Sequence, residues 1–348
     1  MPLVRGSITR FARSGGAIRR ALGTCLAVAV LLTGFASLQS ARAELAIVPI
    51  KHAPLSITKN DVGAVTYGQG YSRLSYNWSG YALENWETGV LYTNVSGSWT
   101  VPVASYKTPG DSCYPIAGWG FATSVSCVAH KVPTMYSAAW VGIGGACTDQ
   151  TCRYVDQTLI QTGTSSDVKA DGTPDYYAWY EMLPDYMQVI GTDQPCDTDA
   201  SGKCFVPRVV KPGDKINTLI RCESNCTPGH PSQTWLISIA DITQDWIHSI
   251  YVPYSSSLLS VEWVQEAPSS SAGVLPLAKF EPVTFTVPAF NSQLAYFPTA
   301  GFGGMGRQAI TMINNYGQTA VPSPPIVGNT FSVCWGDNRA MLAPCAVP

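Results

Sequence analysis

Acidic, amide and aromatic side chains recur at every second position of three short segments of this 348-residue chain. Successive side chains of an extended strand point to opposite faces, so residues two positions apart lie together. Polar groups beside aromatic rings on one face are typical of a binding cleft, whereas the alternative for any single residue is a solvent-facing position. The residues that would share faces are Tyr177, Trp179 and Glu181, then Glu262, Val264 and Glu266, and then Gln157, Leu159 and Gln161.

The motifs of several common catalytic sites are missing from the sequence. It contains no G-x-S-x-G elbow, no H-E-x-x-H motif and no Asp-Thr-Gly or Asp-Ser-Gly pair. Residues 301–306 match G-x-G-x-x-G, but no strand-helix-strand unit surrounds them, so we interpret them as a turn-rich loop. The four histidines stand in no triad-like context and are expected to be structural or exposed: His52, His130, His230 and His248.

Short strands are the elements that must position the polar faces. Many segments rich in β-branched and aromatic residues are separated by clusters of Gly, Pro, Asn, Asp and Ser, and no helical stripe is evident in the mature part. This pattern predicts a single all-β domain over residues 74–348, built as a sandwich or a barrel. The clearest predicted strands are 98–101, 139–142, 158–161, 176–183, 235–239, 261–266 and 283–287.

Composition excludes several classes of protein. Only 13% of the residues are charged while 46% are hydrophobic, which argues against a coiled coil or a charge-rich disordered chain. Lys and Arg number 21 against 23 Asp and Glu, so there is no positive excess to neutralise phosphates. We therefore expect no nucleic-acid partner.

The first 43 residues have the features of a signal peptide. Arginines precede an apolar run, residues 22–38, which is followed by the small-x-small sequence Ala41-Arg42-Ala43, and we predict cleavage after Ala43. The alternative, a membrane anchor, is disfavoured because Gly and Thr interrupt a short run. Cleavage leaves 15 basic against 23 acidic residues, a net charge of −8. We expect an exported protein, extracellular or periplasmic and without membrane association, in which residues 44–73 form a propeptide or an N-terminal arm.

Cysteine usage agrees with export. One of the 11 cysteines lies in the signal segment, and the other ten form five pairs of close neighbours in the sequence, which we interpret as local disulfides of an oxidising compartment. The spacing Cys222-x3-Cys226 alone could suit zinc, but no second close pair with a histidine nearby accompanies it, so neither a metal nor a cofactor is expected. The ten are Cys113, Cys127, Cys147, Cys152, Cys196, Cys204, Cys222, Cys226, Cys334 and Cys345.

Seven sequence blocks in a fixed order resemble the glutamic peptidases, or eqolisins, from about Asn77 to Trp335. This resemblance implies a secreted, acid-acting endopeptidase built as a sandwich of two curved antiparallel sheets, as in concanavalin-like lectins. Each block alone is weakly specific, whereas their common order is hard to explain by chance. The blocks are 77–82, 95–102, 139–143, 159–163, 178–181, 262–266 and 277–280.

The resemblance also implies a catalytic pair. Gln161 matches the family's catalytic glutamine and Glu266 its catalytic glutamate, with Glu262 as an easily confused neighbour. Gly144 and Tyr177 stand where family members carry acids, which bears on pH optimum and subsites more than on the reaction. The side chains expected to surround the site and bind substrate are Trp78, Trp140, Tyr177, Trp179 and Glu181.

The chemistry of the pair suits peptide hydrolysis in acid. A glutamate with a pKa of about 4.3 can take a proton from water and then protonate the leaving amine near that pH. A glutamine amide can stabilise the oxyanion without changing charge. We therefore expect a monomeric endopeptidase acting on polypeptides. The alternative is a secreted lectin-like module without catalysis, whose aromatic face (Trp140, Tyr177 and Trp179) stacks on sugar rings.

Overall fold

The computed structural model describes residues 49–59, 64–66, 70–106, 133–191, 208–287, 289–291, 293–294, 308–324, 329–336 and 345. All of them belong to one unit of the chain, Ile47–Pro348. The predicted signal peptide and the G-x-G-x-x-G segment lie outside the described residues.

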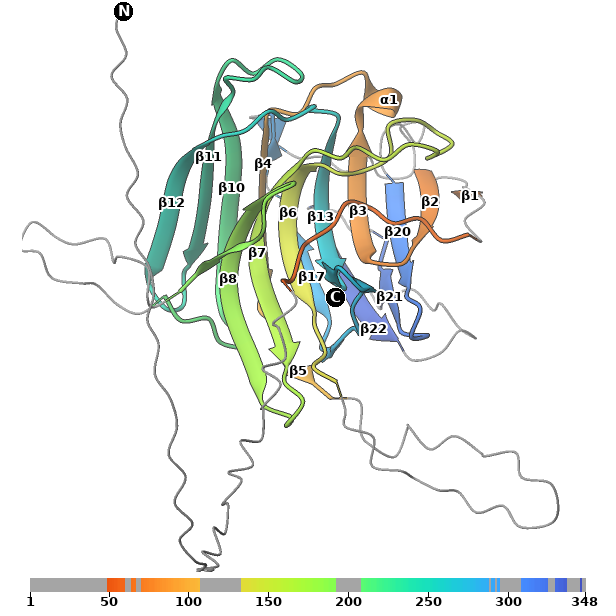
Figure 1. Cartoon of the computed structure of the whole chain (residues 1–348), viewed down its shortest axis with the longest axis vertical. Helices are drawn as coiled ribbons and strands as arrows, with labels where there is room; N and C mark the ends of the chain where they lie inside the picture. The colour runs from red at the N-terminus through yellow and green to blue at the C-terminus, as the bar shows by residue number, and fades with distance from the viewer. Residues whose placement is uncertain are drawn as a thin grey trace, which may run out of the picture. The chain divides into compact units, whose positions relative to one another are not determined.

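One layer of the fold contains the strands that were predicted to carry the polar faces. Its neighbouring strands pair antiparallel, except that β2 and β20 run parallel. Within it, β13 lies between β3 and β6, and β7 lies between β6 and β8 (Figure 1). In spatial order these strands are β9 (Gln188–Ile190), β8 (Pro174–Met182), β7 (Leu159–Val168), β6 (Ala138–Gly144), β13 (Ser260–Glu266), β3 (Trp78–Glu84), β20 (Gln308–Ile313), β2 (Gly70–Ser75) and β1 (Ala64–Thr66).

The second layer is also antiparallel and returns to the first through β20, which pairs with β21 as well as with β3. Strands β4 and β10 of this layer pack against β6 and β7 of the first. Its strands in spatial order are β12 (Trp246–Pro253), β11 (Thr234–Asp241), β10 (Lys215–Ser224), β4 (Asn94–Thr100), β17 (Val283–Thr286), β22 (Thr330–Gly336) and β21 (Thr319–Pro322).

Short elements complete the described part of the chain. Its only helix is the single turn α1 (Asn85–Thr88), and no helix there is long and apolar enough to cross a membrane. The remaining short strands are β5 (Ala104–Ser105), β14 (Ser269–Ser270), β15 (Gly273–Val274), β16 (Lys279–Phe280), β18 (Ala289–Phe290) and β19 (Gln293–Leu294). Each of the seven predicted strand segments falls on an observed strand, so the predicted all-β sandwich is confirmed.

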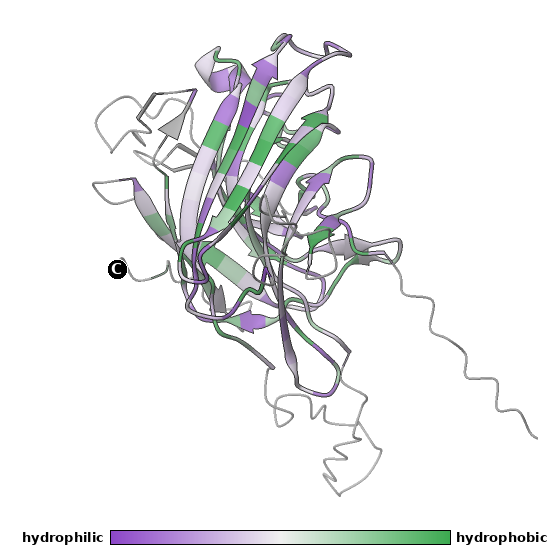
Figure 2. Ribbon diagram, turned by 90° about the vertical axis from the view of Figure 1, so that its left-hand side faces the viewer, coloured by the Kyte–Doolittle hydropathy of each residue, from purple (hydrophilic) through white to green (hydrophobic). Residues whose placement is uncertain are grey.

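Alternation along the strands places the core between the layers. In β6, Val141 and Ile143 point inward and join a cluster that includes Trp263 of β13 and Trp99 of β4. Figure 2 shows the result as hydrophobic positions alternating with polar ones along the strands. The central strands β3, β6, β7 and β13 are nevertheless buried at every residue, on both faces. Something other than the second layer therefore covers their outer face.

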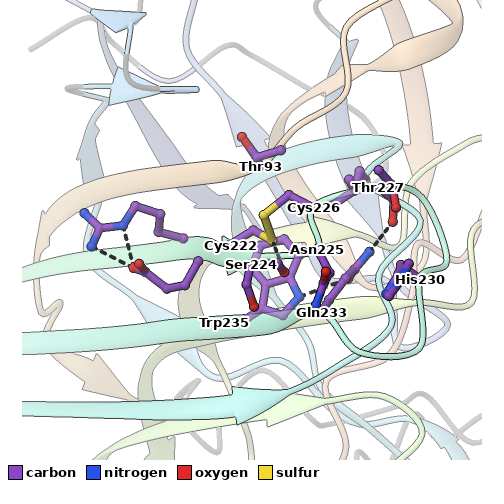
Figure 3. Close-up of a disulfide and its surroundings, with 12 residues drawn as sticks. Thr93, Cys222, Ser224, Asn225, Cys226, Thr227, His230, Gln233 and Trp235 are labelled. Carbon is purple, nitrogen blue, oxygen red and sulfur yellow. Dashed lines mark hydrogen bonds and ion pairs between the residues drawn. A yellow bond between two sulfur atoms is a disulfide. The ribbon is translucent and has the colours of Figure 1, made fainter.

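Three of the five predicted local disulfides lie in the described residues, and all three are formed: Cys147–Cys152, Cys222–Cys226 and Cys334–Cys345. Cys222–Cys226 closes the turn that follows β10, near Gln233, which accepts a hydrogen bond from the indole nitrogen of Trp235 at 3.0 Å (Figure 3). The other four cysteines, Cys113, Cys127, Cys196 and Cys204, lie outside the described residues.

Candidate active site

Strand register brings the predicted site residues to the outer face of the first layer. Gln161 pairs across the ladder with Glu181, and Gly163 lies between Trp140 and Trp179. A Cβ atom on Gly163 would lie 2.3 Å from the carbonyl oxygen of Ala139 and 2.5 Å from Cβ of Trp140. Only glycine at this position allows β6 and β7 to pair this closely beside the Trp140 ring, so Gly163 helps to position that ring.

Glu266 ends β13 and is fully buried. Its Oε2 accepts a hydrogen bond of 2.8 Å from the indole nitrogen of Trp140 and lies 2.8 Å from Nδ1 of His52. Burial raises the pKa of Glu266 well above its usual range, and the Trp140 N–H partly offsets this by favouring the ionised form. Glu266 therefore holds its proton more tightly than an exposed glutamate.

Gln161 is likewise fully buried, on β7. Its Nε2 donates to the main-chain carbonyl oxygen of His52 at 2.8 Å and to Oε2 of Glu181 at 3.2 Å. The two residues predicted to be catalytic thus meet at the same residue, His52, one through its carbonyl and the other through its ring.

His52, which was expected to be structural or exposed, is completely buried and lies within this site. Its backbone N–H donates to Oε2 of Glu181 at 2.9 Å, and its ring stacks on Trp179 with centroids 3.7 Å apart and an interplanar angle of 6°. Burial lowers the pKa of His52 to about 4, against the opposing pull of the Glu181 carboxylate. His52 was missed because its segment has no periodicity and carries no motif.

Glu181 and Trp78, two of the residues predicted to bind substrate, also lie near Gln161 and Glu266. Burial raises the pKa of Glu181 to about 7, an effect that His52 reduces and Glu266 increases. Trp78 meets Trp140 edge-on, with ring centroids 4.9 Å apart, and its indole nitrogen donates to the carbonyl oxygen of Ala53 at 3.0 Å. The side-chain amide of Asn77, which the sequence did not single out as a binding residue, donates to the same oxygen at 3.3 Å.

The groups around Tyr177 and Glu262 differ from those around Gln161 and Glu266. The Tyr177 hydroxyl donates to Oδ2 of Asp167 at 2.9 Å, and no hydrogen bond described for Tyr177 reaches Gln161 or Glu266. Glu262 is buried, and burial raises its pKa well above the usual range, with the negative charges of Asp156 and Glu84 adding to the effect. Of the two acids Glu262 and Glu266, Glu266 is the one with a described hydrogen bond to the Trp140 ring.

The absence of an acidic residue at position 144, where the resembling family carries one, has a steric reason. This glycine has φ +94°, in the region that side chains rarely adopt. A Cβ there would lie 2.2 Å from the carbonyl oxygen of Thr158. An acidic residue cannot occupy position 144 without movement of the backbone.

The side chains of the site can transfer protons and donate a hydrogen bond to a carbonyl oxygen. Among the described residues, no group of three or more His, Cys, Asp or Glu side chains could hold a metal ion. The groups present are two carboxyls with raised pKa values, Glu181 and Glu266, and one neutral amide donor, Gln161. This set suits acid–base chemistry at an amide carbonyl.

A family model and a sequence relative agree with the resemblance of the sequence blocks. The family model described as the Peptidase A4 family matches residues 76–335. The chain is similar to Aspergillopepsin-2 of Aspergillus niger, with 26% identity over 266 residues, 76% of this chain and 82% of that protein. The solved structure of Scytalido-glutamic peptidase with a peptide-based transition state analog aligns with a TM-score of 0.44 and 20% identity, over 75% of this chain and 98% of that one.

Proposed function

The chain belongs to the Peptidase A4 family, the glutamic peptidases, and from this membership we propose that it is an exported acid endopeptidase with Glu266 and Gln161 as its catalytic pair. The observation that carries the proposal is the convergence of both side chains on His52, whose carbonyl oxygen accepts from Gln161 while its ring contacts Glu266. A polypeptide substrate is implied by the family itself. Family membership favours this function over the lectin-like alternative.

Glu266 is proposed as the group that moves protons. Its ionised form takes a proton from the attacking water, and the resulting carboxylic acid then protonates the nitrogen of the leaving amine. Hydrogen bonding from Trp140 favours the ionised form and partly offsets burial, which favours the neutral form. Histidine would be protonated already at the acid pH at which a glutamate can alternate between its two forms.

Gln161 is proposed as the stabiliser of the oxyanion. Its Nε2 already donates to a main-chain carbonyl oxygen at 2.8 Å, the length of a good N–H···O bond. Glu181 accepts from the same nitrogen at 3.2 Å and so orients the amide. Because the amide carries no charge at any working pH, its contribution persists under acid conditions.

Export and acid tolerance rest on independent features. The disulfides suit an oxidising compartment, and the arginine-rich apolar N-terminus suits a signal peptide. Acid denaturation proceeds largely through protonation of paired carboxylates, and a chain with only 13% charged residues has few such pairs to lose.

The test is cleavage of an unfolded protein by the purified chain from pH 2 to 7, beside the variants Glu266→Gln and Gln161→Ala. We expect activity on the acid side in the wild type and its near loss in both variants. Glu262→Gln is the matched control, because it removes a buried acid of the same strand face and should stay active. The proposal is wrong if the wild type is inert throughout, or if either site variant keeps full activity.

A further inference from the structure

Residues 51–56 lie along the candidate active site as an extended peptide. Figure 1 shows this N-terminal segment in red, crossing in front of β3 and β13. Lys51 forms a two-bond antiparallel bridge with Ser269, with N···O distances of 2.9 and 2.8 Å. Further along, the N–H of Leu55 donates to the carbonyl oxygen of Gly145 at 2.9 Å. The segment therefore covers the part of the outer face that carries the candidate site, and it contributes to the burial of the central strands there.

Main-chain groups on both sides of one peptide bond are held by the site. Upstream, the N–H of His52 donates to Glu181 and its carbonyl oxygen accepts from Gln161, at 2.9 and 2.8 Å. Downstream, the carbonyl oxygen of Ala53 accepts from the indole nitrogen of Trp78 at 3.0 Å, and the Ala53 N–H favours the ionised form of Glu266. The bond between His52 and Ala53 thus has the oxyanion donor on its carbonyl side and the acid on its amide side.

Fixing a flexible segment this closely costs conformational entropy, which its contacts must offset. Those contacts resemble recognition of an extended peptide, in which main-chain hydrogen bonds supply affinity and side-chain pockets supply selectivity. The pocket for the residue before the bond is the face of Trp179, on which the planar His52 ring stacks at 3.7 Å. The residue after the bond, Ala53, is small, and Pro54 follows it.

We propose that the chain is its own first substrate and that it cleaves the bond between His52 and Ala53 within the same molecule. This inference rests on the function proposed above. It also specifies a substrate class: extended peptides with a planar side chain before the cut bond and a small residue after it.

The reaction is hydrolysis with solvent water as the second reactant. The water oxygen bonds to the carbonyl carbon of His52 while Glu266 accepts a proton from that water and Gln161 stabilises the negative carbonyl oxygen. The C–N bond then breaks, and Glu266 returns a proton to the nitrogen of Ala53. The products are a carboxyl group on His52 and an amino group on Ala53, so atoms and charges balance.

The His52 ring must leave Glu266 before water can attack. Its Nδ1 lies 2.8 Å from Oε2 of Glu266, while its Nε2 is buried without a hydrogen-bond partner among the described residues. The titratable groups that face the ring are Glu181 of β8 and Glu266 of β13, whereas β7 and β6 contribute Gln161 and Trp140, which do not titrate. As described, the segment closes the site to other substrates.

The test incubates the full-length chain at several pH values between 3 and 6 and follows its new N-terminus by intact mass and N-terminal sequencing. We expect a chain that begins at Ala53, formed at a rate that does not change over a tenfold dilution. Glu266→Gln should remain uncut, even when a trace of wild-type protein is added. Cleavage of this variant by the added wild type, or a rate that falls on dilution, would overturn cleavage within one molecule.

Two substitutions at Ala53 test the bond itself. Ala53→Ser keeps a small residue and its N–H and should be cut at a similar rate, whereas Ala53→Pro removes the N–H and should stay intact at this bond. Activity on an added unfolded protein is measured in the same samples. If the added protein is digested while no chain begins at Ala53, the self-cleavage proposal is wrong and the peptidase proposal stands; if neither is cut, the peptidase proposal fails.

Discussion

The main-chain carbonyl oxygen of His52 lies 2.8 Å from Nε2 of Gln161. This is the contact expected between a substrate carbonyl and an oxyanion donor, and here the carbonyl belongs to the chain that carries the donor. The ring of the same histidine contacts the carboxyl of Glu266. One residue of the N-terminal segment, His52, therefore contacts both members of the proposed catalytic pair.

Replacing Gln161 by Ala is expected to lower kcat about 100- to 1000-fold, the usual loss when one oxyanion donor is removed. KM should change much less, because the donor acts mainly on charge that develops in the transition state. Steady-state kinetics on a peptide at fixed acid pH measures both. Gln157→Ala is the control, since Gln157 is exposed and precedes β7. Equal losses in the two variants would contradict the assignment.

Replacing Trp140 by Phe is expected to move the acid limb of the pH–activity profile to higher pH. The Trp140 N–H favours the Glu266 carboxylate, so its loss raises the pKa of Glu266 and reduces the ionised fraction at any given acid pH. The measurement is kcat/KM against pH. Trp235→Phe, which removes an indole donor from β11 of the other layer, should leave the limb in place. An unmoved limb in Trp140→Phe would refute this role.

The contribution of His52 to docking of the N-terminal segment is expected to weaken as pH falls from about 6.5 to about 4. The pKa of His52 is lowered to about 4 in the docked state, so the released segment binds a proton more readily than the docked one. This contribution is fully present above pH 6.5 and falls by up to tenfold per pH unit below it, about 3 kcal/mol in all, while protonation of Glu181 and Glu266, whose pKa values are raised, acts in the opposite direction. NMR titration of His52 in the Glu266→Gln and Gln161→Ala variants would report the shift. A His52 pKa at or above 6.5 in both would disprove it.

Opening the disulfide between Cys222 and Cys226 is expected to lower stability without changing the reaction. A loop this short contributes about 2 kcal/mol by restricting the unfolded chain. Its surroundings, Gln233 and Trp235 among them, share no described contact with the proposed catalytic pair (Figure 3). Denaturant unfolding of the double Cys→Ser variant should show the loss, with kcat/KM of the folded protein unchanged. A fall in kcat/KM would mean that the turn supports the site.

The strands could be predicted from the sequence because their determinants are local. Runs rich in β-branched and aromatic residues and bounded by turn formers identified segments such as 261–266 and 235–239, and these are strands β13 and β11. Strand ends were less accurate, and β7 continues to Val168, seven residues beyond the predicted end at Gln161. Its last half is polar, Thr164 to Asp167, and pairing with β8 as far as Val168 keeps it in the sheet.

The occupant of the site could not be predicted in this way. His52 is 109 residues from Gln161 and 214 from Glu266 in the chain, and its placement depends on contacts that form only in the folded protein. Gly144 illustrates the same limit, because its incompatibility with a side chain follows from the position of the Thr158 carbonyl. Residue type and order identified the proposed catalytic pair by resemblance, but not what lies between its members.

The N-terminal segment is covalently joined to β2, and as a result cleavage of the segment favours the open site over the closed one. A tethered peptide competes with free substrates at an effective concentration of about millimolar, whatever the concentration of the protein. Once the bond after His52 is cut, the part before it becomes a separate ligand that dilutes away, while Ala53 and the residues after it remain attached. Rebinding of the released part then depends on its bulk concentration, so a single hydrolysis leaves the His52 side of the site open.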